Sequence, residues 1–414
     1  MKNNINIFED DRFANFFPLT YMRPIFDLRC GILKLRQKIS FIFSETDCNL
    51  ILRTELEKLY ENRFPQKNIN RIQKGKNIFV NGSIIVDEKV KKLLFSIPNK
   101  TGLFNEKICI GFRTDFDSDE KISSEDISRI TKNISRKEID FPAFNYIWEI
   151  VDRNSKEIIS DYNKIVKSKK NHLNNYENFY KINSENIFIG KDVSIEPNVV
   201  LDATKGSIFI DDKARLMSNC VIKGPVYIGK NSVVKVGAKI YSGTSLGKMS
   251  KVGGEIEETI FQGYSNKQHD GFLGHSYLGE FVNLGADTNN SNLKNNYKTI
   301  KSYFYPMKKF IDTNLQFFGM VIGDHSKSGI NTTFNTGCVI GLGCNLYSAD
   351  LFSGFIPSFS WGTAKKLYNY RSNKMLETAE IVKKRRNLTL NSIEKNLFIN
   401  CFKNTKMLRE IFNG

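Results

Sequence analysis

Two of the four histidines in this chain, His269 and His275, lie six residues apart in a segment crowded with amides and tyrosines, residues 261–297. An imidazole ring titrates near neutral pH, so a histidine can take a proton from a substrate and later return it. Scarce histidines gathered in one segment predict a site of proton transfer. We predict that His275 is the catalytic base, whereas His269 is also explained as a residue that caps a turn.

A six-residue repeat surrounds these histidines and predicts the scaffold that holds them. Its aliphatic positions before and after the short insertion ATKGS are Ile189, Ile195, Leu201, Ile210, Leu216, Ile222, Ile228, Val234, Ile240, Leu246 and Val252. Neither an α-helix nor an ordinary strand has a period of six. A triangular solenoid does, because each hexad is one short strand plus a turn and three hexads close a coil. We therefore predict a left-handed parallel β-helix over residues 187–360, an exception to the usual right-handed crossover.

The repeat is weaker over residues 256–271 and then resumes. Its later positions are Phe272, Leu278, Leu284, Ile322, Ser328, Phe334, Ile340 and Leu346. About six coils are expected from this count. Between Asp287 and Phe318 the repeat is interrupted, and long loops on a rigid scaffold usually serve function.

The rest of the chain has other patterns. Residues 1–166 alternate short apolar runs with helical periodicity, which predicts an α/β sheet domain that ends in a helix at 144–166. Residues 167–186 are polar and predict a linker. Residues 361–414 lack hexads and carry helical spacing of apolar residues, which predicts a C-terminal helical cap.

Three motifs carry a resemblance to a known family. They are GHSYLGEFVNLGADT followed by KNNY (274–288 and 294–297), PLTYMRPIFDLRCGIL (18–33) and IGDHSKSGINTTFNTG (322–337). Together they resemble the bifunctional N-acetylglucosamine-1-phosphate uridyltransferase/glucosamine-1-phosphate acetyltransferase family, in a variant branch described as sugar nucleotidyltransferase-like. The resemblance implies a nucleotidyltransferase-like fold for residues 1–166 and an acyltransferase β-helix that works as a homotrimer.

The resemblance also implies roles for single residues. His275 would take the proton from a sugar amine as the amine attacks the thioester of acetyl-CoA. The positions that match contacts to the amino sugar and its phosphate are Lys267, Tyr277, Asn283, Asn296 and Tyr297, with Lys294 as a less secure addition. Ala286 and Ser328 would lie along the groove for the pantetheine arm of acetyl-CoA.

Two departures from the family pattern affect the sugar contacts. Asp287 stands where the family's G-A-G-T motif has its second glycine. Lys298 and Thr299 follow Tyr297, where the family has Y-D-G. Both changes concern how the sugar is held more than the transfer of the acetyl group.

The predicted front domain lacks the glycine-rich loop with which nucleotidyltransferases cradle phosphates. The sequence Glu9-Asp10-Asp11-Arg12 stands where that loop would be. Arg23 and Arg29 are candidates for binding a nucleotide phosphate, and the alternative is that they pair with Asp10, Asp11 or Asp27. These aspartates could also hold Mg²⁺ for uridylyl transfer from UTP, but the sequence does not select among them.

Composition narrows the function classes further. The chain has a net charge of +17, but its lysines are spread throughout, so we predict no nucleic-acid partner. The seven cysteines form no C-x-x-C pair, and no apolar run is long enough to span a membrane. With no secretion signal recognised at the start, a cytoplasmic location is expected.

Two alternatives from other classes remain. A β-helix with a front domain that lacks the glycine-rich loop would also suit a non-catalytic scaffold that binds sugar nucleotides. His269, His275 and His325 would suit a zinc hydratase of the carbonic anhydrase-like β-helix type, because three imidazoles and a water make a zinc site. The spacing of these histidines does not match that class, and the metal ligands stay unknown.

Overall fold

A computed structural model describes residues 3–44 and 48–412, which form two compact units. The first unit contains residues 1–16, 22–28 and 33–146, and the second contains residues 17–21, 29–32 and 147–414. The chain near residues 17–32 therefore alternates between the two units. The structure groups the helix α5 (Ile147–Ile165) with the second unit, whereas the sequence suggested that it ends the first domain.

The first unit is an α/β domain built on one six-stranded sheet with the order β2-β1-β4-β6-β5-β8. Its strands are β1 (Asn4–Phe8), β2 (Asn49–Ile51), β4 (Gly75–Asn81), β5 (Thr101–Asn105), β6 (Ile108–Phe116) and β8 (Ser135–Glu138). Its helices are α1 (Leu35–Ile42), α2 (Glu57–Arg63), α3 (Glu88–Ser96) and α4 (Ser124–Lys132), and β3 (Arg71–Ile72) pairs with β7 (Glu120–Lys121). Strands β2, β1 and β4 run parallel, so their carboxyl ends lie at one edge of the sheet. The predicted α/β class is confirmed.

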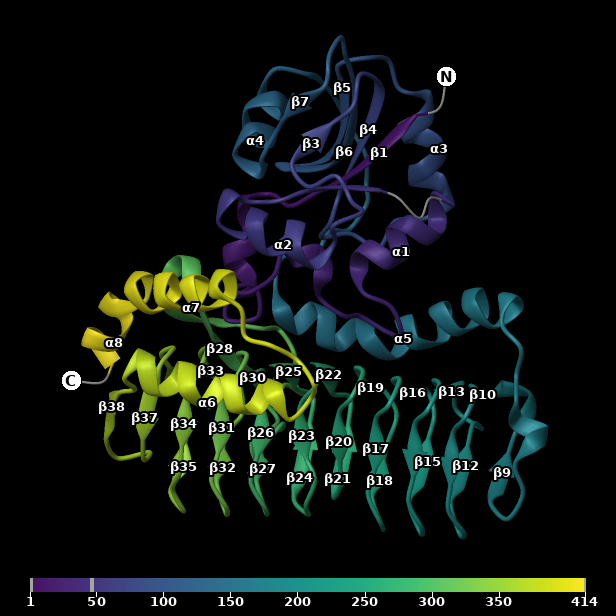
Figure 1. Ribbon diagram of the computed structural model, residues 1–414, viewed down its shortest axis with the longest axis vertical. Helices are drawn as coiled ribbons and strands as arrows, with labels where there is room; N and C mark the ends of the chain where they lie inside the picture. The colour runs from purple at the N-terminus through teal and green to yellow at the C-terminus, as the bar shows by residue number, and fades with distance from the viewer. Residues whose placement is uncertain (1–2, 45–47, 413–414) are drawn as a thin grey trace. The chain divides into compact units, whose positions relative to one another are not determined.

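The second unit is a β-solenoid whose strands stack in parallel rows, visible in Figure 1. We call the three rows face one, face two and face three, in the order in which each coil visits them. Face one consists of β10 (Ile187–Ile189), β13 (Ile208–Ile210), β16 (Val226–Ile228), β19 (Thr244–Leu246), β22 (Ile260–Gly263), β25 (Tyr277–Glu280), β30 (Met320–Ile322), β33 (Cys338–Ile340) and β36 (Phe355–Ile356).

Face two consists of β11 (Ser194–Ile195), β14 (Arg215–Leu216), β17 (Val233–Val234), β20 (Lys251–Val252), β23 (Asn266–Lys267), β26 (Asn283–Leu284), β31 (Lys327–Ser328), β34 (Asn345–Leu346) and β37 (Ser360–Gly362), with β38 (Leu367–Asn369) antiparallel at its end. Face three consists of β9 (Tyr180–Ile182), β12 (Val200–Asp202), β15 (Val221–Lys223), β18 (Lys239–Ile240), β21 (Glu255–Glu257), β24 (Phe272–Gly274), β27 (Asn289–Asn290), β32 (Thr333–Phe334) and β35 (Leu351–Phe352). Segments 167–186, predicted as a linker, contain three short 3-10 helices as well as β9.

The solenoid fold is confirmed, and its left-handed sense stays a prediction. The expected six coils are wrong, because face one has nine strands within the described residues. The count failed where the spacing between inward residues shortens to four or five, and it also missed the inward Phe352 and Ile356 beyond Leu346. The inward residues of the stretch with shortened spacing are Ile256, Phe261, Lys267, Leu273, Leu278 and Leu284. The inward residue of β24 is accordingly Leu273, and the predicted Phe272 is partly exposed.

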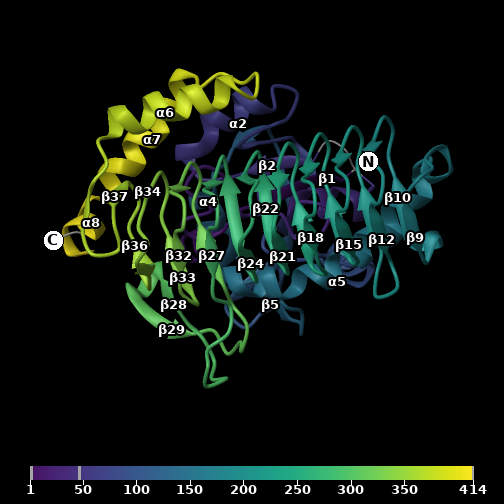
Figure 2. The same cartoon turned by 90° about the horizontal axis from the view of Figure 1, so that it is seen from below.

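Additional elements cover or extend the solenoid. The interruption after β27 contains a hairpin, β28 (Lys301–Phe304) with β29 (Lys309–Asp312), which projects from the stacked coils in Figure 2. The predicted C-terminal helices are confirmed as α6 (Ser372–Lys384), α7 (Ser392–Asn404) and α8 (Lys406–Phe412). None of the helices in the described residues is long and apolar enough to cross a membrane.

The inward side chains form one continuous apolar core, and truncating one of them is expected to be costly. We expect Ile240→Ala, at a fully buried position, to lower the free energy of unfolding by about 2–5 kcal/mol, because the lost contacts leave a cavity. Urea unfolding followed by tryptophan fluorescence measures this, since both tryptophans, Trp148 and Trp361, belong to the second unit. The control Val236→Ala, at an exposed turn position, should change it by less than about 0.5 kcal/mol. If both substitutions lowered the free energy of unfolding by the same amount, the inward position of Ile240 would be contradicted.

Candidate functional site

His275 occupies a corner of the solenoid between β24 on face three and β25 on face one. Its backbone has a φ of 48°, in the left-handed region that a sharp corner requires. The His275 N–H donates to the Glu257 carbonyl at 3.1 Å, and its carbonyl accepts from the Gly319 N–H at 2.8 Å. The corner is therefore held by the coil before it and by the chain returning from the β28–β29 hairpin.

The His275 ring contacts three side chains from neighbouring coils. The Asn292 Nδ2 lies 2.9 Å from the His275 Nδ1 and donates to the Glu257 Oε1 at 3.1 Å. The Glu257 Oε1 is itself 3.9 Å from the His275 Nδ1. The Phe317 ring stacks on the imidazole with a centroid distance of 5.2 Å. Which of the two ring nitrogens carries the proton of the neutral imidazole decides which partner donates in the Asn292–His275 contact.

Burial sets the charge states of this corner. Burial lowers the pKa of His275 to about 4, so the ring is neutral at physiological pH. Burial also raises the pKa of Glu257, a shift that the Asn292 hydrogen bond opposes and the Glu255 carboxylate reinforces. A neutral imidazole can accept a proton, and the nearby carboxylate can stabilise the imidazolium that results.

Glu257 and Asn292 were not predicted from the sequence, yet a signal for both exists. Glu257 precedes His275 by 18 residues and Asn292 follows it by 17, which is one coil in each direction. In a solenoid, residues one coil apart stack on each other. A search for polar residues at this spacing from His275 would have found both.

Two predicted substrate contacts are buried and therefore do not enter the proposed site. Lys267 is an inward residue of β23 with no exposed surface, and its Nζ donates to the carbonyls of His269 at 3.0 Å and Asp270 at 3.1 Å. Tyr277 is also fully buried on face one. Its hydroxyl accepts from the Arg29 N–H at 2.8 Å and lies 2.8 Å from the Gln262 Oε1.

The predicted acetyl-CoA contacts lie at or near another corner, between face two and face three. Ala286 is partly exposed there, whereas Ser328 is an inward residue whose Oγ lies 2.9 Å from the Thr288 Oγ1. Asp287 has a φ of 54°, which explains why the family places glycine at this position. The exposed His269 lies at the same corner one coil earlier.

The remaining predicted sugar contacts lie in two further places. Asn283 is on the outer side of face two, where its Oδ1 accepts from the Asn266 Nδ2 at 3.2 Å. Asn296 and Tyr297 are exposed in the loop before β28, where the Tyr297 N–H donates to the Lys294 carbonyl at 2.9 Å. Within one chain, the predicted site residues that are not buried thus lie in three places. These are the His275 corner, the His269 corner together with the outer side of face two, and the loop before β28.

The arrangement of the histidines bears on the zinc alternative. His275 lies between face three and face one, His325 between face one and face two, and His269 between face two and face three. One chain therefore cannot bring all three to the same ion. In the described part of the chain no group of three or more His, Cys, Asp or Glu side chains could hold a metal ion.

The carboxyl edge of β1 and β4 in the first unit carries a polar network where ligands of doubly wound sheets usually bind. Asp10 accepts from the Arg12 Nη2 at 2.6 Å and from the Asn81 Nδ2 at 2.8 Å, and Arg12 also donates to the Ser83 Oγ at 2.7 Å. Glu9 is fully buried and accepts from the Arg53 Nη1 at 2.8 Å.

The aspartates predicted for Mg²⁺ do not fit that role. Asp10 is engaged by Arg12 and Asn81. Burial alone would raise the pKa of Asp27, but Arg36 and Lys34 hold it well below its ordinary value, and the Tyr60 hydroxyl donates to it at 2.5 Å. Asp11 is exposed, and the described residues contain no cluster of ligands around it.

The predicted phosphate-binding arginines are both buried, and they belong to different units, Arg23 to the first and Arg29 to the second. The Arg29 side chain donates to the Ile32 carbonyl and lies 5.1 Å from the centre of the Tyr227 ring. Arg12 pairs with Asp10, and Arg36 pairs with Asp27. A phosphate clamp of Arg23 and Arg29 stays a prediction that their burial does not favour.

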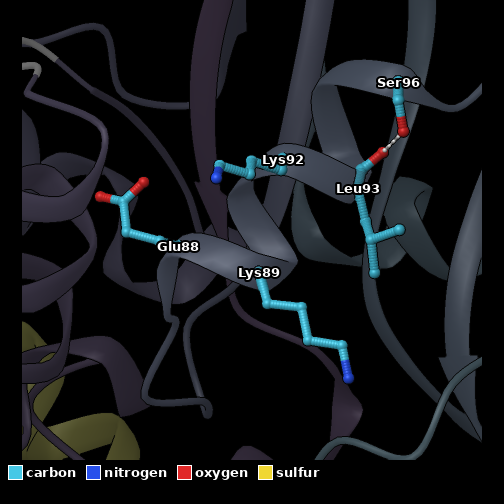
Figure 3. Close-up of a pocket in the computed structure, with 5 residues that line it drawn as sticks. All are labelled: Glu88, Lys89, Lys92, Leu93 and Ser96. Atoms are coloured by element: carbon cyan, nitrogen blue, oxygen red, sulfur yellow. Dashed lines mark hydrogen bonds between the residues drawn. The ribbon is translucent and has the colours of Figure 1, made fainter.

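A surface hollow on α3 does not qualify as a site. Figure 3 shows its lining residues, which all come from this one helix: Glu88, Lys89, Lys92, Leu93 and Ser96. The Glu88 and Lys92 side chains extend into solvent, and the dashed line in Figure 3 joins the Ser96 hydroxyl to the Leu93 carbonyl within the helix. No second element contributes a group that could hold a ligand.

Comparisons with known proteins agree with the fold and the motifs. A family model described as sugar nucleotidyl transferase matches residues 5–170. The chain is 32% identical over 172 residues to the bifunctional protein GlmU of Wigglesworthia glossinidia brevipalpis, covering 37% of this chain and 34% of that protein. The predicted resemblance is confirmed.

Another relative is the bifunctional sugar-1-phosphate nucleotidylyltransferase/acetyltransferase of Sulfurisphaera tokodaii, 28% identical over 156 residues, or 37% of this chain and 38% of that protein. The chain thus spans between a third and two fifths of the length of these relatives. Among solved structures, a UDP-N-acetylglucosamine acyltransferase from Campylobacter jejuni is similar over 58% of this chain and 84% of that chain, with 15% identity and a TM-score of 0.34. At these values the structural likeness carries no argument about function.

The buried ammonium of Lys267 predicts a pH-dependent stability. Burial lowers its pKa to about 8, so between pH 8 and its ordinary value of 10.5 the unfolded chain binds more protons than the folded one. Wild-type stability should therefore rise with pH across that window. Lys267→Met should be more stable than wild type by roughly 1–3 kcal/mol below pH 8, with the gain shrinking towards pH 10.5.

Urea unfolding at pH 7, 8.5 and 10 measures this difference. Lys384→Met, at an exposed position, is the matched control and should show no such pH dependence. A Lys267→Met protein that is less stable than wild type at every pH would show that the two hydrogen bonds of the ammonium outweigh the cost of burying it.

Proposed function

We propose that the β-solenoid is an acyltransferase of amino-sugar nucleotide biosynthesis that moves the acetyl group of acetyl-CoA to a hexosamine 1-phosphate. The observation that carries this proposal is the His275 corner, where a neutral imidazole, a carboxylate and an amide meet inside the motif that resembles the acetyltransferase site. The similarity to bifunctional nucleotidyltransferase/acetyltransferases supports the same reaction class.

In this reaction the protein has to carry out one proton transfer. The sugar amine attacks the thioester carbonyl, and a base removes one proton from the amine nitrogen. The C–S bond then breaks, and CoA leaves as a thiolate that takes up the proton from the base. For His275 to accept the amine proton at Nε2, the ring proton must lie on Nδ1, where the Glu257 Oε1, 3.9 Å away, is placed to attract it. We therefore assign Glu257 as the residue that orients His275, with Asn292 as the bridge between them.

One observation favours a second candidate for the base. His269 is exposed and lies at the corner that also carries Ala286, beside the outer side of face two where Asn266 contacts Asn283. Two of the predicted ligand contacts are thus nearer to His269 than to His275 within one chain. The two histidines can be separated by experiment.

The test compares His275→Gln with His269→Gln in an assay of thiol release from acetyl-CoA and glucosamine 1-phosphate. Loss of a general base should lower kcat by about 10²- to 10⁴-fold, and we expect this loss in His275→Gln. Glu257→Gln should show a smaller loss in kcat with little change in KM. A large loss in His269→Gln with His275→Gln unaffected would assign the base to His269. An inactive wild type would defeat the acetyltransferase proposal.

The pH profile gives an independent check on which histidine acts. Because burial lowers the pKa of His275 to about 4, the ring stays unprotonated down to that pH. We therefore expect kcat/KM to stay level from pH 7.5 to about pH 5. A fall centred near 6.5, the ordinary value for histidine, would exclude His275 as the base.

For the first unit we propose binding of the resulting sugar phosphate and uridylyl transfer from UTP. The family model over residues 5–170 supports this, whereas the ion pair of Asp10 with Arg12 at the strand ends places a carboxylate where phosphates would bind and engages the neighbouring arginine. Release of pyrophosphate from UTP and N-acetylglucosamine 1-phosphate is the deciding measurement. Binding without release would reduce this unit to the non-catalytic role of a sugar-nucleotide-binding scaffold.

We further propose that the protein works as a homotrimer in the cytoplasm. The division of the predicted residues among separate corners supports an assembly, because residues of two copies could then complete one site. Light scattering on the purified chain gives the mass of the assembly. A monomer with full acetyltransferase activity would contradict the shared site.

A further inference from the structure

The outer side of face two carries a row of polar side chains, of which only Asn283 has a predicted role. Lys251, Asn266, Asn283 and Lys327 are successive partners along β20, β23, β26 and β31. All four are partly exposed. On face one the same row is buried and mostly apolar, with Ser245 as a polar member and with Phe188 stacked on Phe209 at 4.4 Å. Face two is therefore chemically distinct from its neighbour.

The end of helix α6 brings further cations to this row. The run Lys383-Lys384-Arg385-Arg386 lies at the end of α6, and two of its residues are engaged. Lys383 is buried and its Nζ pairs with the Glu394 Oε2 at 2.5 Å. The Arg386 Nη2 donates to the Asn266 Oδ1 at 2.8 Å, which joins the helix end to face two.

We call Lys235, Lys251, Arg385 and Arg386 the face-two basic cluster. Burial and then the charges of Arg386, Arg385 and Lys235 lower the pKa of Lys251, so every charged group that perturbs it is a cation. Burial and then Arg385 lower the pKa of Arg386 in the same way. The Arg386 Nε is buried and has no hydrogen-bond partner. Like charges held together with an unmet guanidinium donor are costly unless an anion is bound.

The helix dipole explains only part of this cluster. Basic residues are stabilised near the carboxyl end of a helix, which accounts for Arg385 and Arg386. It does not account for Lys235 and Lys251, which come from β-solenoid coils 16 residues apart in sequence. Two separate elements thus contribute positive charge to one place, and the nearby amides of Asn266 and Asn283 add neutral hydrogen-bonding groups.

We propose that the face-two basic cluster binds the phosphate group of a phosphorylated ligand. The planar fork of Arg386 suits two oxygens of a phosphate, and Lys251 supplies a point charge beside it. The Asn266–Asn283 pair next to the cluster is placed to contact hydroxyl groups of the same ligand. Two sources share this chemistry, a hexosamine 1-phosphate and the phosphates of CoA, and naming either one rests on the proposed acetyl transfer.

Calorimetric titration of the full chain tests the site without requiring any turnover. The probes are glucosamine 1-phosphate, glucosamine, CoA and dephospho-CoA. We expect binding of at least one phosphorylated probe to weaken about tenfold or more in Arg386→Gln and in Lys251→Gln, and to weaken with added salt. Lys384→Gln, an exposed position on the same helix with the same charge change, should bind as wild type does.

The pattern of losses identifies the source of the phosphate. Weaker binding of glucosamine 1-phosphate alone assigns the sugar phosphate, and weaker binding of CoA alone assigns the cofactor. Wild-type affinity for all probes in both variants would overturn the proposal, provided that their thermal unfolding matches wild type. If a variant unfolds at lower temperature, Arg386→Lys, which keeps the charge, should restore part of the affinity. Because binding is measured directly, an absence of acetyl transfer would not affect the outcome.

Discussion

The closed interior of the solenoid is the constraint on which the other features depend. Strands of all three faces place side chains into a core that runs through the coils, and these side chains are almost entirely buried. An interior packed in this way leaves no room for a substrate, so chemistry has to occur on the outside. Lys267 is the exception, because its ammonium occupies an inward position, where it donates to two backbone carbonyls and where burial lowers its pKa despite the charges of Asp270 and Asp287.

The corners follow from the same constraint and provide the places for function. A chain that turns so sharply needs residues with positive φ, and His275, Asp287 and His325 all have it. Side chains at such positions point away from the core and stack on residues one coil away. The contacts among Glu257, His275 and Asn292 arise in this way, from three successive coils. A solenoid can therefore assemble a site from residues with a regular spacing.

The repeat allowed the fold to be predicted, and irregular coils limited what could be predicted of the site. Six-residue spacing from Ile210 to Val252 defined the solenoid, but the shorter steps after Ile256 hid the inward position of Lys267. Tyr277 was predicted as a contact to the sugar, although it is buried in the same row of face one as Phe209 and Tyr227. Its partner Arg29 is distant in sequence, so this contact depends on tertiary packing that no local pattern encodes.

Different elements pack on the outer sides of face one and face two. We infer that the cover on face one mainly stabilises the fold, whereas face two keeps polar groups that could bind a ligand. Face one is apolar on its outer side and packs against α5, where Tyr162 meets the Phe209 ring and the Asn154 Nδ2 donates to the Gly243 carbonyl. That packing adds stability but leaves no polar surface for a ligand. Face two is instead approached by the basic end of α6, where the Arg386 side chain donates to the Asn266 Oδ1. An anion that bound there would neutralise the cations and link the helix to the coils, so ligand binding and docking of the C-terminal helices would stabilise each other.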